Sequence, residues 1–140
     1  MTNAATLTDL FRHMEWADAA VWTAVLASPQ ARTDAELHPY VSHLDAVQRG
    51  FLRVWRGEPR EAPDPTGGVV EALMPWVRPY DADAREHLAP RSDADLAQPL
   101  PVPWSATVEE RIGRAPETTT TGETALQVVL HSMYHRGQMN

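Results

Sequence analysis

The sequence predicts an all-α fold built on four helices, and three observations support this prediction. Apolar residues recur at spacings of three and four in four separate stretches, which is the period of a helix with one buried face. Capping residues stand before most of these stretches, and proline or glycine follows the first two. With 140 residues, of which 43% are hydrophobic, the chain can bury one core, so we expect one domain over residues 1–140.

The first predicted helix covers residues 7–27. Thr6 is a candidate cap, and Pro29 prevents the helix from continuing beyond Ser28. Its inward stripe consists of Leu7, Leu10, Phe11, Met14, Val21, Val25 and Leu26.

The second predicted helix follows the candidate cap Asp34 and ends near Gly57. Pro39 fits only within its first turn. Residues 58–68 hold three prolines and two glycines without periodicity, which indicates a surface loop. The stripe of this helix consists of Leu37, Tyr40, Val41, Leu44, Val47, Phe51, Leu52, Val54 and Trp55.

The third predicted helix covers residues 69–88 and is interrupted by prolines. Because Pro75 and Pro79 each remove a backbone donor, we expect a kink or a break there. Residues 90–119 are rich in proline and hold short alternating pieces at 101–104 and 108–112. This pattern predicts a long irregular connection with room for a short hairpin between the third and fourth helices. The inward candidates of the third helix are Val70, Leu73, Met74, Val77 and Leu88.

The fourth predicted helix starts at the T-x-x-E sequence of residues 120–123. The hydroxyl of Thr120 and the carboxylate of Glu123 can cap the first turn reciprocally. Leu126, Val129 and Met133 follow at helical spacing. No helix stop signal precedes the end of the sequence, so a native chain that continues beyond Asn140 is one possibility.

Composition argues against several classes of function. The net charge of −7 disfavours binding to nucleic acid or to an anionic membrane surface. Without cysteine there is no disulfide and no thiolate, so any metal must be held by His, Asp or Glu. No stretch approaches the ~18 apolar residues of a membrane span, and the N-terminus lacks the pattern of a signal peptide. We therefore expect a cytoplasmic protein.

Three histidines form a candidate metal site. His131 and His135 lie four residues apart on the fourth predicted helix, so both rings share one face and can bind one ion. Two solvent-exposed histidines are the plainer alternative, because this spacing is common by chance. His43, beside the buried stripe of the second helix, offers a third ligand from a facing helix. Three imidazoles leave one open position, which is typical of catalytic sites.

Other metal and nucleophile chemistries fit less well. A di-iron bundle needs Glu-x-x-His pairs, and no Glu precedes a His by three residues. A zinc protease needs Glu where Ser132 follows His131. No G-x-S-x-G elbow is present.

The remaining prominent residues favour structural roles. Arg136 either orients a ligand or pairs with a surface carboxylate, Gly137 indicates close helix approach, and Tyr134 is expected to pack. His13 and His87 are expected to be solvated or capping residues. Large apolar residues at helical spacing are usually core, which is the expectation for Trp16, Trp22, Trp55, Trp76 and Trp104.

The segment HSMYHRGQMN, residues 131–140, resembles the H-x-x-x-H-R-G-Q signature of the DinB/YfiT-like superfamily. The resemblance extends in order and spacing to HMEWADAAVW at 13–22, HLDAVQRGFLRVWRG at 43–57 and TTGETALQVVLH at 120–131. It implies a four-helix bundle of up-down-down-up connectivity with a metal triad at His43, His131 and His135. Asp18 stands where members of the family often carry Asn.

The resemblance also implies an activity. Characterised relatives include transferases and isomerases that use low-molecular-weight thiols such as bacillithiol or mycothiol. We therefore expect a metal-dependent thiol S-transferase, or a related hydrolase or isomerase, acting on a small electrophile. The alternatives are a stress-associated bundle in which the ion is structural, and a scaffold that has lost its metal.

The expected cofactor is a divalent metal ion. Imidazole ligands suit zinc, nickel, iron and copper alike, so they do not name the ion. Zinc or nickel is the expected ion, with iron or manganese as alternatives. The expected partners are a small-molecule substrate, for which a low-molecular-weight thiol is a candidate, and a second copy of the chain in a homodimer. We expect no binding to nucleic acid or to a membrane.

Overall fold

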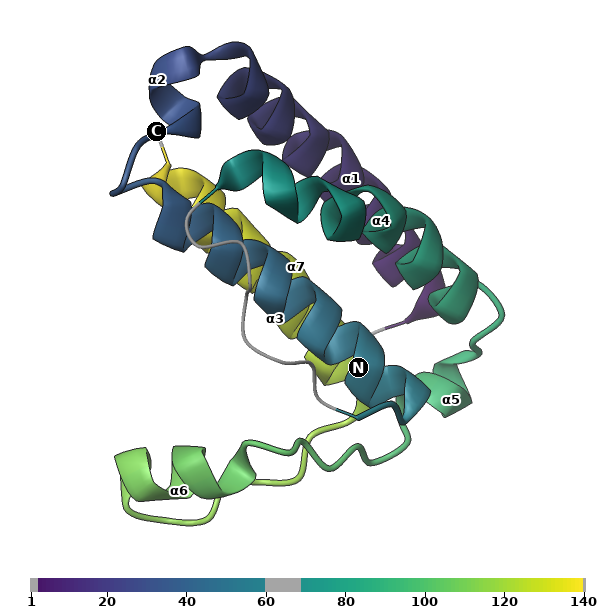
Figure 1. Ribbon diagram of the computed structural model, residues 1–140. Coiled ribbons are helices and arrows are strands. Elements are labelled where there is room, and N and C mark those ends of the chain that lie inside the picture. The colour runs from purple at the N-terminus through teal and green to yellow at the C-terminus, as the bar shows by residue number, and fades with distance from the viewer. Residues whose placement is uncertain (1–2, 60–68, 140) are drawn as a thin grey trace.

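Helices make up nearly all regular structure in this computed structural model, which describes residues 3–59 and 69–139. In chain order they are α1 (Ala4–Ala27), α2 (Pro29–Arg32), α3 (His38–Arg56), the 3₁₀ helix η1 (Val70–Leu73), α4 (Met74–Leu88), α5 (Asp93–Leu96), α6 (Ser105–Ile112) and α7 (Thr121–Gln138) (Figure 1). Within those two ranges there is no strand, and Pro99 and Thr120 form an isolated bridge. The prediction of an all-α fold is confirmed.

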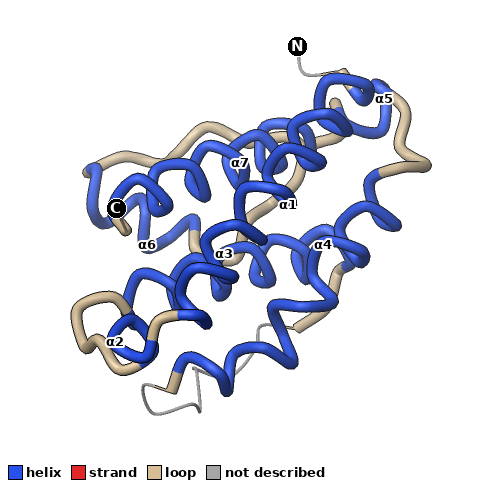
Figure 2. The backbone as a smooth tube through the Cα atoms, turned by 90° about the horizontal axis from the view of Figure 1, so that it is seen from above, coloured by secondary structure: helices blue, strands red, loops and turns tan. Residues whose placement is uncertain are grey.

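The four longest helices pack along one another. α1 contacts α7 and α4, and α3 contacts the same two helices. In Figure 1, α1 and α7 run toward the C-terminal end of the molecule, whereas α3 and α4 run the opposite way. Figure 2 shows the same helices after a quarter turn, with α5 beside the start of α1. A hydrogen bond from the Ala4 amide to Asp93 Oδ1, 2.8 Å long, joins these two elements.

Two clusters of buried apolar side chains lie between the helices. The larger cluster consists of Leu7, Phe11, Met14, Phe51, Leu52, Trp55, Tyr80, Ala84, Leu96, Ala125, Val128 and Val129. The smaller cluster consists of Trp22, Val25, Val41, Val70 and Leu73. Both draw on α1 and α3, so these helices connect the two ends of the core.

The predicted caps of the first two helices were wrong. α1 begins at Ala4, and Asn3 caps it by accepting a 2.8 Å hydrogen bond from the Thr6 amide. Thr6 therefore lies inside the first turn. Asp34 accepts from the amides of Glu36 and Leu37 at 2.7 and 3.1 Å, which closes the turn before α3 without capping the helix. Pro39 lies in the first turn of α3, as predicted.

The third predicted helix is divided. A 3₁₀ turn over Val70–Leu73 leads into α4, where Pro75 falls in the first turn and needs no donor. Pro79 lies inside α4 and removes one helical hydrogen bond. The expected break thus falls before Pro75.

The connection between α4 and α7 is partly helical, and the predicted hairpin was wrong. Residues 108–112 belong to α6, which ends at Gly113 in a left-handed conformation with φ of 74°. Prolines at 101 and 103 remove donors that a strand pair would need. Within the described ranges, strand-like backbone pairing between the two sides is limited to the isolated bridge between Pro99 and Thr120.

Two further predictions concern the last helix and the loop before η1. The reciprocal cap of α7 is confirmed, since Thr120 Oγ1 accepts from the Glu123 amide and Glu123 Oε2 accepts from the Thr120 amide. Most of the predicted loop at 58–68 lies outside the described residues. Among the helices that the structure describes, none is long and apolar enough to cross a membrane.

The tryptophans follow the core prediction only in part. Trp22 and Trp55 are buried, and Trp76 and Trp104 are half-buried against the two clusters. Trp16 departs from the prediction with 68% exposure, because its position on α1 faces away from the other helices. Its ring lies 5.6 Å from that of His13.

Candidate metal centre

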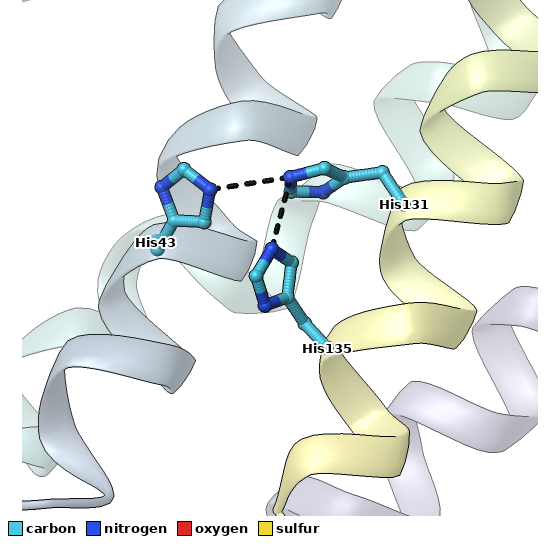
Figure 3. A group of neighbouring side chains, drawn as sticks. All are labelled: His43, His131 and His135. Atoms are coloured by element: carbon cyan, nitrogen blue, oxygen red, sulfur yellow. Dashed lines mark hydrogen bonds between the residues drawn. The ribbon is translucent and has the colours of Figure 1, made fainter.

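α3 and α7 bring the three predicted histidines together. α7 carries His131 and His135 one turn apart, and α3 presents His43 from the facing side (Figure 3). Nε2 of His131 lies 3.2 Å from Nε2 of His43 and 3.1 Å from Nε2 of His135. The three residues offer ligand atoms within 4.8 Å of one another, which is close enough to hold one metal ion.

The spacing of the nitrogens fits a shared ion. Two nitrogens that each bind zinc at about 2.0–2.1 Å in a tetrahedral arrangement lie roughly 3.3 Å apart. The two measured Nε2 separations, 3.2 and 3.1 Å, are close to this value. Moreover, Nε2 of His131 faces the Nε2 atoms of both His43 and His135. The lone pairs of the three nitrogens can then point at one cation. The donor set therefore fits a divalent metal ion.

The electrostatics of the cluster favour the neutral forms of His131 and His43. Burial, followed by the neighbouring charges of His135 and His43, lowers the pKa of His131 to about 4. Burial and His135 likewise lower the pKa of His43. A histidine binds a metal ion through its neutral form, so both shifts favour ligation near neutral pH.

Aromatic packing orients the rings at this end of α7. The rings of Tyr40 and Tyr134 lie 6.4 and 5.2 Å from that of His135. Ligating histidines commonly donate their second N–H to an acceptor. Nδ1 of His131 and of His135 is buried, and neither has a hydrogen-bond partner within the described part of the chain. Packing and helix geometry, rather than an acceptor, therefore hold these two rings.

A buried polar network lies directly behind the histidines. Asp18 of α1 accepts hydrogen bonds from Gln48 at 2.6 Å and from Arg136, with which it also forms an ion pair. Gln48 also donates to Ser132 Oγ at 3.1 Å. Ser132 and Arg136 are the residues that follow the two ligands of α7. The network thus joins α1, α3 and α7 next to the site.

The network contains a carboxylate in an unfavourable environment. Burial raises the pKa of Asp18, although the hydrogen bond from Gln48 and the charge of Arg136 act to lower it. The guanidinium and the amide replace much of the hydration that Asp18 loses.

A second contact between α3 and α7 lies farther from the histidines. Trp55 donates its Nε1–H to Thr124 Oγ1 over 3.0 Å, and both residues are buried. Together with the bond between Gln48 and Ser132, it fixes one helix against the other.

Sequence reasoning missed Gln48, Ser132 and the role of Asp18 as their shared partner. A signal existed for Gln48, which lies four residues after Leu44 and four before Leu52 in the buried stripe of α3. A polar residue at such a position requires a buried partner. Ser132, which stands where a zinc protease would carry Glu, is fully buried.

Three smaller predictions about α7 were wrong. Arg136 is half-buried and pairs with the interior carboxylate of Asp18, so the alternative of a surface carboxylate was wrong, whereas a role in orienting a ligand stays a prediction. A Cβ atom at Gly137 would meet nothing within 4 Å in the described part of the structure, so this glycine does not mark close helix approach. Tyr134 is 63% exposed instead of packed.

An open cavity of about 1500 Å³ adjoins the site. His43 and His131 are part of its wall, which continues along α3 and α7 to the segment around α6. A small molecule can therefore reach the histidines from solvent.

Comparison of the chain with models of protein families, with curated proteins and with solved structures found no match.

Proposed function

We propose that this protein is a divalent-metal-dependent enzyme of the DinB type, with a four-helix bundle of up-down-down-up connectivity. The directions and contacts of α1, α3, α4 and α7 support this topology. The H-x-x-x-H-R-G-Q sequence on α7 and His43 on α3 support the family assignment. The proposed activity is transfer of a low-molecular-weight thiol to a small electrophile.

One observation carries the proposal of a catalytic site: three imidazoles converge at the wall of an open cavity. His43 is exposed, and the cavity reaches both His43 and His131. Three protein ligands beside solvent-accessible space are typical of catalytic metal sites, whereas structural sites are closed by four ligands.

The chain's own residues supply binding and order. His43, His131 and His135 would hold the ion, and Asp18, Gln48 and Arg136 keep α7 in place against α3. A divalent ion on such ligands lowers the pKa of a thiol or water that binds to it, and so supplies a nucleophile near neutral pH. We propose zinc or nickel as the ion, because both suit imidazole ligands.

A structural role for the ion is less well supported. α3 and α7 are already joined by the buried hydrogen bonds from Gln48 to Ser132 and from Trp55 to Thr124. These contacts hold the two helices together without an ion.

The test is metal analysis of untagged protein, followed by a thiol-conjugation assay. The assay would use bacillithiol or mycothiol with 1-chloro-2,4-dinitrobenzene. We expect close to one zinc or nickel ion per chain and conjugation that depends on it. Loss of one ligand in His135→Ala should lower metal affinity and activity by at least ~100-fold, more than is typical for outer-shell substitutions.

The matched control is His13→Ala, because His13 is an exposed histidine of α1 outside the cluster. It should retain the metal content and the activity of the wild type. Equal conjugation by His135→Ala would refute the catalytic proposal. Unfolding on chelation, with no conjugation by the loaded protein, would favour the structural role instead.

A homodimer is part of the same proposal. Leu130, Met133 and Tyr134 recur at helical spacing on the outer face of α7 and are 48%, 60% and 63% exposed. An exposed apolar row of this kind supports a contact with a second copy.

A further inference from the structure

The cavity beside the histidines has an apolar wall formed by α3. From His43 onward, Ala46, Val47, Gly50 and Val54 line it at spacings of three and four residues. These side chains are small or aliphatic. These residues form an apolar strip that begins at the candidate metal site, and α3 also contributes Ser42, Arg49 and Arg53 to the lining.

A second apolar part of the lining comes from the segment that leads into α6. Leu100, Val102, Trp104 and Val108 line the cavity from this side. The ring of Trp104 meets that of Phe51 edge to face, with centroids 4.9 Å apart. Both rings line the cavity, and their contact links α3 to the segment before α6.

Charged groups along the cavity do not supply an unpaired cation for an anionic ligand. Arg49 pairs with Asp45 at 2.6 Å, and Arg53 pairs with Glu58 at 3.3 Å. Both arginines thus already have carboxylate partners. The α3 strip and the segment before α6 offer apolar contacts, whereas α7 lines the cavity with Glu123, Thr124 and Gln127 beside His131. The polar groups nearest the start of the strip are those of the candidate metal site.

Gly50 shows that the middle of the strip is open. A Cβ atom at this position would meet nothing within 4 Å in the described part of the structure. Gly50 lies inside α3, where glycine is unfavourable by roughly 0.5–1 kcal/mol relative to alanine. A larger residue here would extend into the cavity without displacing core side chains.

We propose that this cavity binds an unbranched alkyl or acyl chain whose polar, reacting end lies at the three histidines. This inference rests on the proposed function and names its substrate class as an electrophile with a long apolar tail. The strip from His43 to Val54 is about 16 Å long, because a helix rises 1.5 Å per residue.

The experiment uses a series of alkyl hydroxamates, from acetohydroxamate to octanohydroxamate, titrated calorimetrically into the zinc-loaded protein. The hydroxamate group binds the ion, and the alkyl chain samples the cavity. We expect each added methylene to increase affinity by about two- to fourfold, up to the factor for full burial of a methylene group. Equal affinities across the series would overturn the proposal.

Gly50→Leu tests the placement of the chain. It should remove the dependence on chain length and leave the affinity for acetohydroxamate unchanged. The matched control is Ala82→Leu, which adds a similar side chain at an exposed position of α4 outside the cavity. This control should keep the wild-type dependence of affinity on alkyl-chain length. If Gly50→Leu also keeps it, the alkyl chain lies elsewhere and the proposal is overturned.

A second titration separates this inference from the metal proposal. In metal-free protein, 1-octanol should bind more tightly than 1-butanol. Binding is followed by tryptophan fluorescence, and the contribution of Trp104 is obtained by subtracting the signal of Trp104→Phe from that of the wild type. Failure of acetohydroxamate to bind would count against the metal site alone. Failure of 1-octanol to bind more tightly than 1-butanol would count against the apolar cavity.

Discussion

Asp18 and Arg136 form the charged pair on which the interior of the site depends. Their side chains are only 5% and 12% exposed. Removing one partner of a buried pair leaves an uncompensated charge, whereas replacing both with apolar groups is often close to neutral.

We expect Asp18→Ala to reduce the free energy of unfolding by about 3–5 kcal/mol, because Arg136 then stays buried without its carboxylate. Urea denaturation of the metal-free protein measures this loss. The double variant Asp18→Leu with Arg136→Met should recover most of it. A single variant as stable as the wild type would show that Arg136 finds another partner.

Asp81 makes stability depend on pH. Burial, followed by the charges of Asp18 and Glu15, raises the pKa of Asp81 from 3.8 to about 7, and Arg85 only partly opposes this shift. The folded protein therefore holds this proton more tightly than the unfolded chain does. The resulting stabilisation is complete below pH 3.8 and is lost as the pH rises through about 7.

Asp81→Asn removes this dependence, so the variant should gain stability relative to the wild type between pH 4 and pH 7 as the wild type weakens. Urea denaturation across this range measures the difference. An NMR titration of the Asp81 carboxyl group is the direct check, and a midpoint below pH 5 would contradict the assignment.

At the scale of single elements, two glycines of α3 have opposite roles. Gly50 lies within the helix and has open space around its Cβ position, whereas Gly57 ends the helix with φ of 67°. Alanine is favourable at the first position and strained at the second.

We expect Gly50→Ala to stabilise the protein by about 0.5–1 kcal/mol and Gly57→Ala to destabilise it by a similar amount. Thermal unfolding followed by circular dichroism measures both effects, and each variant serves as the control for the other. A destabilised Gly50→Ala would mean that the strip along α3 is filled.

The elements differ in how well the sequence predicted them. α7 was predicted closely, because the cap at Thr120 and Glu123 is a local signal and the four-residue spacing of His131 and His135 fixes their common face. The cap of α1 was misplaced, because more than one polar residue precedes the apolar stripe and Asn3 caps the helix a turn earlier than expected.

Apart from the histidine cluster, contacts that depend on the detailed packing of one helix against another were not predicted. The hydrogen bonds of Gln48 join residues that are 30 and 84 positions apart in the chain, and no local pattern sets that pairing. α6 was also missed, because its eight residues bury no side chain and so show no clear apolar stripe. The histidine cluster was predicted because its ligands need only two facing helices.

At the scale of the whole molecule, the exposed row on α7 predicts self-association. We expect the wild type to sediment as a dimer and Met133→Glu to sediment as a monomer, because a carboxylate would be desolvated in the contact. Ala82→Glu, on the exposed face of α4, should not change the sedimentation. A wild type that stays monomeric at all concentrations would refute the dimer.

The antiparallel pair α3 and α7 has a consequence for how the chain can change in length. Trp55 meets Thr124, Gln48 meets Ser132 and His43 meets His131, so three contacts join the two helices at different points along their lengths. Deleting one residue of α7 between Thr124 and His131 would turn everything after it by about 100°. Ser132 and both ligands of α7 would then leave their partners together, so this stretch should tolerate substitutions but not insertions or deletions.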